Sequence, residues 1–169
     1  MNKIALIYSY NTRNTANVAK EIKSTFGANV DIDEINAEEI NGTKFLSYEN
    51  LILGVPTWFD GELPNYWDEF VPELETLKLK GKNIAIFGNG DQVNYPENFV
   101  DGIGLMAEII EASGASVIGY TSPEGYTFES SRALKQNKFC GLAIDFENQS
   151  DLNTKRIKDW VSQLKNDFK

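Results

Sequence analysis

The chain has 169 residues with 25 acidic and 16 basic side chains, so its formal net charge is −9. This balance argues against nucleic acid and anionic membrane surfaces as partners and favours proteins with basic faces. Histidine is absent and Cys140 is the only cysteine, which excludes imidazole-based catalysis, an internal disulfide and a zinc site with the usual ligands.

Short apolar runs alternate along the chain with segments of helical period, a pattern typical of parallel βαβ units. Strands are predicted at residues 3–8, 29–35, 50–55, 83–87 and 116–120. Helices are predicted around residues 18–26, from about residue 64, over about residues 98–112 and at residues 157–168, with one or two helical turns between residues 36 and 40. Pro72 is expected to kink or shorten the helix that begins near Pro64.

The segment from residue 121 to residue 138 keeps no sustained period. We interpret it as an insertion that splits the last strand; the alternative is an Ω-like surface loop packed by Tyr126 and Phe128. Strands that are apolar throughout, such as residues 84–87, predict burial on both faces of a sheet. We therefore predict one domain over residues 1–169 with an α/β fold, in which helices cover both faces of a doubly wound, five-stranded parallel sheet. With no membrane-length apolar run and no signal-peptide pattern, the cytoplasm is the expected location.

Ligands of such folds bind at the carboxyl ends of the strands, which directs attention to residues 9–15, 56–62 and 88–98. The first of these loops joins a strand to a helix N-terminus, where unpaired N–H groups and the helix dipole attract an anion. Thr12, Asn14 and Thr15 can donate further hydrogen bonds. Neither GxGxxG nor GxxxxGK[ST] is present, so a monophosphate fits better than a longer phosphate chain. The alternative is an ordinary polar turn capped by Asn11 or Thr12.

The second and third loops each carry one aromatic residue that can stack on a planar ring. Trp58 lies in the loop after the third strand and Tyr95 in the glycine-containing loop after the fourth. The two side chains can sandwich one ring, while main-chain groups at Gly88 and Gly90 contact its polar edge. Taken singly, each aromatic residue fits a packing role better than a stacking role.

The order of these motifs closely resembles the long-chain flavodoxins: a hydroxyl-rich loop, PTWxxGEL, FGxGDQxxYxxNF and a late insertion. The resemblance covers essentially the whole chain and implies one non-covalent FMN. It also implies that the phosphate lies in the first loop, the isoalloxazine ring between Trp58 and Tyr95, and the Phe59–Asp60 peptide beside the N5 atom of the ring. The residues implied to bind the cofactor are Tyr10, Asn11, Thr12, Arg13, Asn14, Thr15, Pro56, Thr57, Trp58, Phe59, Asp60, Gly61, Gly88, Asn89, Gly90, Asp91, Tyr95 and Asn98.

The first loop departs from the family pattern at two positions. Tyr10 stands where the family has its first hydroxyl residue, and Arg13 stands where it has a glycine. Loss of the glycine matters if the backbone there needs a positive φ. Arg13 can compensate by pairing with a phosphate, or it can point into solvent.

The expected function is that of an electron carrier that shuttles single electrons between a flavodoxin reductase and low-potential acceptor proteins with basic faces. A monomer without a catalytic residue or a bound metal is expected. One alternative is an FMN-dependent oxidoreductase that acts directly on NAD(P)H or a quinone. A second is a degenerate flavodoxin-like binding module that has lost FMN.

Overall fold

The predicted strands form one parallel sheet in a computed structural model that describes residues 1–169. The strand order is β2-β1-β3-β4-β5, with bounds β1 (Ile4–Tyr8), β2 (Ile32–Asn36), β3 (Asn50–Gly54), β4 (Asn83–Asn89) and β5 (Ser116–Ile118). A further strand, β8 (Leu142–Ile144), also pairs with β4. Because β5 pairs with the start of β4 and β8 with its end, the two together occupy the fifth position of the sheet. The predicted fold and the split last strand are both confirmed.

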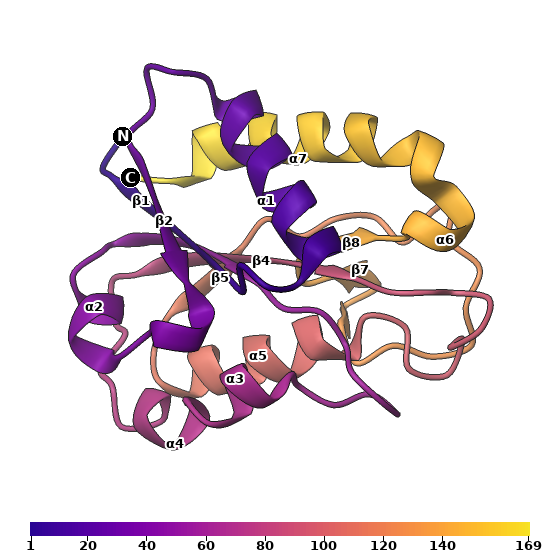
Figure 1. The fold of residues 1–169 in the computed structure, drawn as a ribbon, viewed down its shortest axis with the longest axis horizontal. Coiled ribbons are helices and arrows are strands. Elements are labelled where there is room, and N and C mark those ends of the chain that lie inside the picture. The colour runs from indigo at the N-terminus through magenta and orange to yellow at the C-terminus, as the bar shows by residue number, and fades with distance from the viewer.

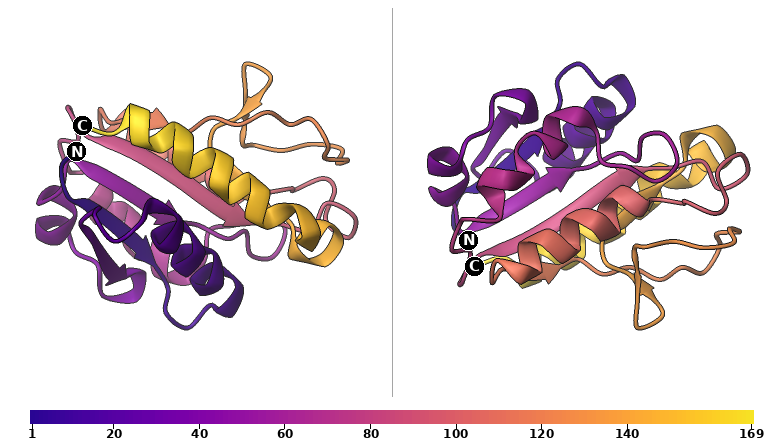
Figure 2. Two further views of the ribbon diagram at one scale, coloured as in Figure 1. Left: turned by 90° about the horizontal axis from the view of Figure 1, so that it is seen from above. Right: turned by 90° about the horizontal axis from the view of Figure 1, so that it is seen from below.

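Helices cover both faces of this sheet (Figures 1 and 2). On one face lie α1 (Arg13–Phe26) and α7 (Asn153–Asp167); on the other lie α3 (Asn65–Asp68), α4 (Val71–Leu74) and α5 (Asp101–Ala112). Alternate strand residues enter the two cores: Ile4 and Leu6 pack with α1 and α7, while Ala5 and Ile7 pack on the opposite side. No helix of the structure is both long enough and apolar enough to span a membrane.

The helix predicted from Pro64 is divided into two short helices, α3 and α4. Pro72 is the second residue of α4, where a missing N–H costs no helical hydrogen bond, so it favours a new start over continuation. Helical turns at residues 36–40 are confirmed as η1 (Ala37–Glu39). Two short helices, α2 (Gly42–Leu46) and α6 (Phe146–Gln149), and the turn η2 (Ser150–Leu152) were not predicted.

The insertion forms a small hairpin that folds against the body of the protein. Its strands are β6 (Leu134–Lys135) and β7 (Lys138–Phe139), and the two residues between them have φ values of 51° and 64°. Positive φ at both positions is characteristic of the tightest hairpin turns. Tyr126 and Phe128 pack on Phe99 and Phe139, with ring centroids 5.2–5.7 Å apart.

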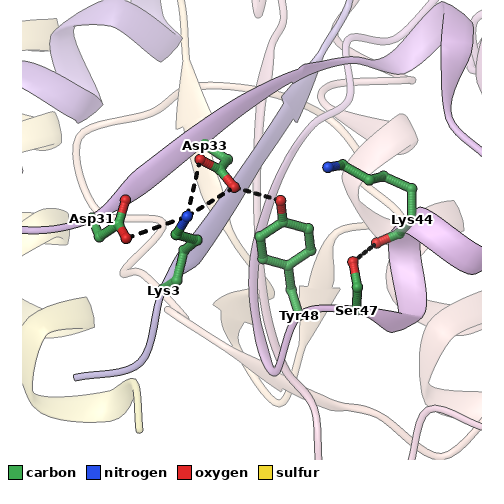
Figure 3. Close-up of polar contacts among 6 residues, drawn as sticks. All are labelled: Lys3, Asp31, Asp33, Lys44, Ser47 and Tyr48. Atoms are coloured by element: carbon green, nitrogen blue, oxygen red, sulfur yellow. Dashed lines mark hydrogen bonds and ion pairs between the residues drawn. The ribbon is translucent and has the colours of Figure 1, made fainter.

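A polar cluster ties β1, β2 and the loop before β3 together at the amino ends of the strands (Figure 3). The Lys3 amine lies 3.3 Å from Asp31 and 3.4 Å from Asp33, and the Tyr48 hydroxyl donates to Asp33 at 2.6 Å. The Tyr48 hydrogen bond, with a smaller contribution from Lys3, lowers the pKa of Asp33 below its ordinary value. These contacts lie at the end of the sheet opposite the three candidate loops.

Candidate functional site

The first loop ends in a helix N-terminus with free donors. The first backbone hydrogen bond of α1 runs from the Ala16 N–H to the Thr12 carbonyl, at 2.9 Å. The N–H groups of Arg13, Asn14 and Thr15 therefore have no acceptor, and the first turn holds no acidic residue. Thr12 is the N-cap residue but makes no side-chain capping bond. The donors that a capped turn would use are thus available to an anion.

Glu38 of η1 shapes this loop from the side. Its carboxylate accepts hydrogen bonds from the Ser9 hydroxyl and the Asn11 side-chain amide, both at 2.8 Å. The Asn11 N–H in turn donates to Ser9 Oγ at 3.2 Å. Both donors of Asn11 are therefore engaged within the protein, where they fix the course of the loop. Tyr10 is half exposed and packs its ring on Tyr8, with centroids 5.1 Å apart.

Two adjoining cavities of about 370 and 560 Å³ lie between the three loops. Both volumes fall within the usual range of small-molecule sites, roughly 300–1,000 Å³. The larger cavity reaches the phosphate end, and the smaller one lies over the Trp58 turn. Of the predicted residues, those that line at least one cavity are Thr12, Arg13, Asn14, Pro56, Thr57, Trp58, Phe59, Asn89, Gly90, Asp91, Tyr95 and Asn98. Those that line neither are Tyr10, Asn11, Thr15, Asp60, Gly61 and Gly88.

The Trp58 turn is a tight hairpin with a strained residue at its tip. Trp58 and Glu62 exchange two backbone hydrogen bonds of 2.8 Å, and Phe59 between them has a φ of 47° and is 71% exposed. A large side chain in this left-handed conformation costs about 1–2 kcal/mol. The indole of Trp58 meets Phe59 and Tyr66 edge to face, at 6.4 and 5.8 Å, and lines both cavities. An aromatic wall is thus held in place by perpendicular neighbours.

The third loop is folded around the carboxylate of Asp91. It accepts hydrogen bonds from the N–H groups of Val93 (3.1 Å) and Asn94 (2.9 Å) and from the side-chain amides of Asn94 (2.8 Å) and Asn148 (2.9 Å). Burial acts to raise the pKa of Asp91, but these hydrogen bonds outweigh it, so the pKa is lowered. The resulting turn places Tyr95, which is 56% exposed, along both cavities.

Asp145 fixes the same loop from behind. It is fully buried, and its Oδ2 atom accepts from the Gln92 N–H at 3.1 Å and the Gln92 side-chain amide at 2.7 Å. Gln92 Oε1 accepts from the Thr127 N–H at 2.6 Å, which joins the loop to the insertion. Sequence reasoning did not assign this role to Asp145. The one local signal at Asp145 is that an aspartate directly before a helix often caps its N-terminus. Asp145 does cap α6, because its side chain accepts a hydrogen bond from the Asn148 N–H three residues later.

Glycine residues in the site keep backbone segments close together. A Cβ at Gly88 would lie 2.3 Å from the Val55 carbonyl oxygen, so Gly88 lets β4 approach the end of β3. Gly61 has a φ of 92°, and a Cβ there would lie 2.6 Å from the Asp101 carboxylate. Neither glycine lines either of the two cavities between the loops, so the structure supports a packing role for both.

Two buried polar atoms in the three loops have no hydrogen-bond partner: Thr15 Oγ1 and Asn89 Oδ1. Buried polar groups normally have a partner, so these atoms fit a ligand with polar groups of its own. Arg13 lines the larger cavity and forms no ion pair. Free N–H groups and an arginine at one end, with aromatic walls at the other, fit a ligand that has a planar polar ring and an anionic group. The fold and the site thus define a doubly wound α/β protein with a site for a small phosphorylated aromatic ligand.

Comparisons with known proteins agree with this class. The family model for flavodoxin matches residues 6–160. Curated flavodoxins from Nostoc sp. and Trichodesmium erythraeum are 43% and 44% identical to the chain, over 98–99% of it and 97–99% of their own lengths. The crystal structure of Fusobacterium nucleatum flavodoxin bound to flavin mononucleotide has a TM-score of 0.95 and 34% identity, with complete coverage of both chains. The chain belongs to the flavodoxin family.

Proposed function

We propose that this protein is a low-potential electron carrier that binds one FMN without a covalent bond. The observation that carries the proposal is the pair of adjoining cavities, which joins the free N–H groups of α1 to the aromatic residues Trp58 and Tyr95. When bound, the isoalloxazine ring of FMN supplies the capacity to take up and release single electrons. The structural relative bound to FMN and the curated flavodoxins support this cofactor.

The side chains around the cavities have distinct proposed roles. The N–H groups of Arg13, Asn14 and Thr15 bind the phosphate, and the Arg13 guanidinium adds a charge-assisted contact. Trp58 and Tyr95 cover the ring, and Asn89 Oδ1 accepts a hydrogen bond from a ring N–H. The exposed acids beside the site, Asp60, Glu62 and Glu147 among them, disfavour added negative charge on the ring and therefore lower its potential.

The physiological partners are proposed to be a reductase and acceptor proteins that dock through basic faces. The net charge of −9 and the acids near the cavity support this choice, because complementary charge increases the rate of encounter. The monomer is the proposed state, and the cytoplasm is the proposed location.

The test is an equilibrium titration of the cofactor-free protein with FMN and, separately, with riboflavin. We expect one FMN per chain, tighter binding of FMN than of riboflavin, and weakening of FMN binding alone as salt increases. A protein that binds neither flavin contradicts the proposal and favours a degenerate module. If the loaded protein turns over NAD(P)H or a quinone rapidly without a separate reductase, the oxidoreductase alternative is correct.

A further inference from the structure

Tyr66 places an unused hydroxyl group beside the anion end of the site. Tyr66 lies in α3, which is held against the sheet by a buried hydrogen bond of 2.9 Å from Trp67 Nε1 to the Gly54 carbonyl. Its ring meets Trp58 edge to face, with centroids 5.8 Å apart and planes at 86°. Its hydroxyl oxygen is buried and has no hydrogen-bond partner. The side chain therefore has a fixed ring and an unsatisfied end.

The Thr12 side chain is the candidate partner for this hydroxyl, because Thr12 lines the larger cavity together with Trp58, against which the Tyr66 ring packs. Burial raises the pKa of Tyr66 to about 12, while the adjacent Thr12 hydroxyl acts in the opposite direction. The tyrosine is therefore protonated at neutral pH and can donate a hydrogen bond. Thr12 makes no side-chain capping bond and lines the larger cavity with Arg13 and Asn14. Two neighbouring hydroxyl groups, neither of them engaged, thus lie at the phosphate end.

We propose that Tyr66 is a positioning residue for the phosphate of the bound cofactor, acting through Thr12. Tyr66 Oη–H donates to Thr12 Oγ1, and this leaves the single hydroxyl hydrogen of Thr12 free to donate to a phosphate oxygen. Polarisation along the pair strengthens the outer hydrogen bond. The inference rests on the proposed function, since it assumes that FMN occupies the cavities. It adds a residue from α3, outside the three loops, to the determinants of selectivity for FMN over riboflavin.

The experiment compares the dissociation constants of FMN and riboflavin for wild type and for Tyr66→Phe, which keeps the ring against Trp58. Loss of one hydrogen bond predicts about fivefold weaker FMN binding, with riboflavin binding unchanged because riboflavin has no phosphate. Tyr48→Phe is the matched control. It removes a tyrosine hydroxyl that donates at 2.6 Å to Asp33 at the far end of the sheet (Figure 3), and should leave both constants unchanged.

Substitutions at Thr12 complete the test and do not depend on the folding of the Tyr66 variant. Thr12→Val should reduce FMN affinity without changing riboflavin affinity, and Thr12→Ser should retain most of the FMN affinity. In the Thr12→Val background, Tyr66→Phe should cause no further loss.

Three results would overturn the inference. An equal loss of FMN and riboflavin affinity in Tyr66→Phe would mean that the residue acts through Trp58. An unchanged FMN affinity would mean that the hydroxyl has no role, and additive losses in the double variant would mean that it does not act through Thr12. A wild-type protein that fails to bind FMN would contradict the proposed function itself, which separates the two failures.

Discussion

Asp145→Asn is expected to destabilise the protein strongly, although it only replaces one carboxylate oxygen with an NH₂ group. The wild-type carboxylate accepts two hydrogen bonds from Gln92 through Oδ2 and one from the Asn148 N–H through Oδ1, at 3.0 Å. The Asn148 side-chain amide also donates to Oδ1 at 3.1 Å and to Oδ2 at 3.0 Å. In the variant, one oxygen becomes an NH₂ group and faces donors. Gln92 cannot turn its own amide to compensate, because its Oε1 atom is engaged by the Thr127 N–H.

The magnitude follows from the number of buried donors that lose an acceptor. The new NH₂ group faces either the two donors of Gln92 or the N–H of Asn148, so one or two donors lose their acceptor, and each costs about 1–3 kcal/mol. Removal of a buried charge offsets part of this loss. We therefore expect a decrease of about 2–4 kcal/mol in the free energy of unfolding, a large part of the roughly 5–15 kcal/mol of a typical domain.

The assay is urea unfolding of the cofactor-free protein at neutral pH, with Asp151→Asn as the control. Asp151 lies in η2, six residues away, and is exposed, so the same chemical change there should alter the free energy of unfolding by less than about 0.5 kcal/mol. FMN affinity should also fall in the Asp145 variant because the loop that carries Tyr95 is less firmly held. If the two variants unfold at the same urea concentration, the buried carboxylate does not support the loop.

Three further outcomes are expected. Trp58→Ala should weaken FMN binding by about 1 kcal/mol or more with little loss of stability, whereas Trp160→Ala, in the core, should cost about 3–5 kcal/mol of stability. Flavin titration and urea unfolding measure the two effects, and the reverse order would contradict the assignment of Trp58 to the ring. Gly88→Ala should destabilise the protein by about 1–3 kcal/mol in the same unfolding assay, since its Cβ would meet the Val55 carbonyl oxygen at 2.3 Å, and an unchanged midpoint would refute this. The hydrogen bonds to Asp91 lower its pKa, so their contribution to stability is present above pH 3.8, the ordinary pKa value, and is lost as pH falls through the folded-state pKa. A carboxyl-carbon NMR titration of Asp91 should therefore have its midpoint below 3.8, and a higher midpoint would contradict the geometry.

The sheet was predictable because its strands leave a strong local signal. Residues 84–87 are apolar throughout and are fully buried, as expected for a strand covered on both faces. The short helices α2 and α6 were not predictable in the same way, since four or five residues are too few to display a helical period. Capping by Asn41 and Asp145 is what defines them, and such caps resemble ordinary polar loop residues in the sequence.

The candidate site was predictable where the residue type alone indicated a role. Trp58 and Tyr95 were expected to form walls, and both line the cavities. Glu38 was missed because its role depends on contacts between segments about 30 residues apart in the sequence, which no local pattern reveals. The role proposed for Tyr66 likewise depends on a residue about 50 positions away. Tyr10 was expected to bind the cofactor from its place in the motif, and its assignment stays a prediction that its packing on Tyr8 does not favour.

Each of the three loops is held by a polar group from outside it. Glu38 holds the first loop through Ser9 and Asn11, the Gly102 N–H of α5 holds the second loop through Thr57 Oγ1, and Asp145 holds the third loop through Gln92. These supports come from different elements and share no residue, so a substitution at one of them should perturb one part of the site first. The cavities, in contrast, are lined by all three loops, and a ligand there contacts them together. We therefore expect ligand binding to couple three independently supported loops, with changes at Glu38 acting on the phosphate end and changes at Asp145 on the ring end of the same ligand.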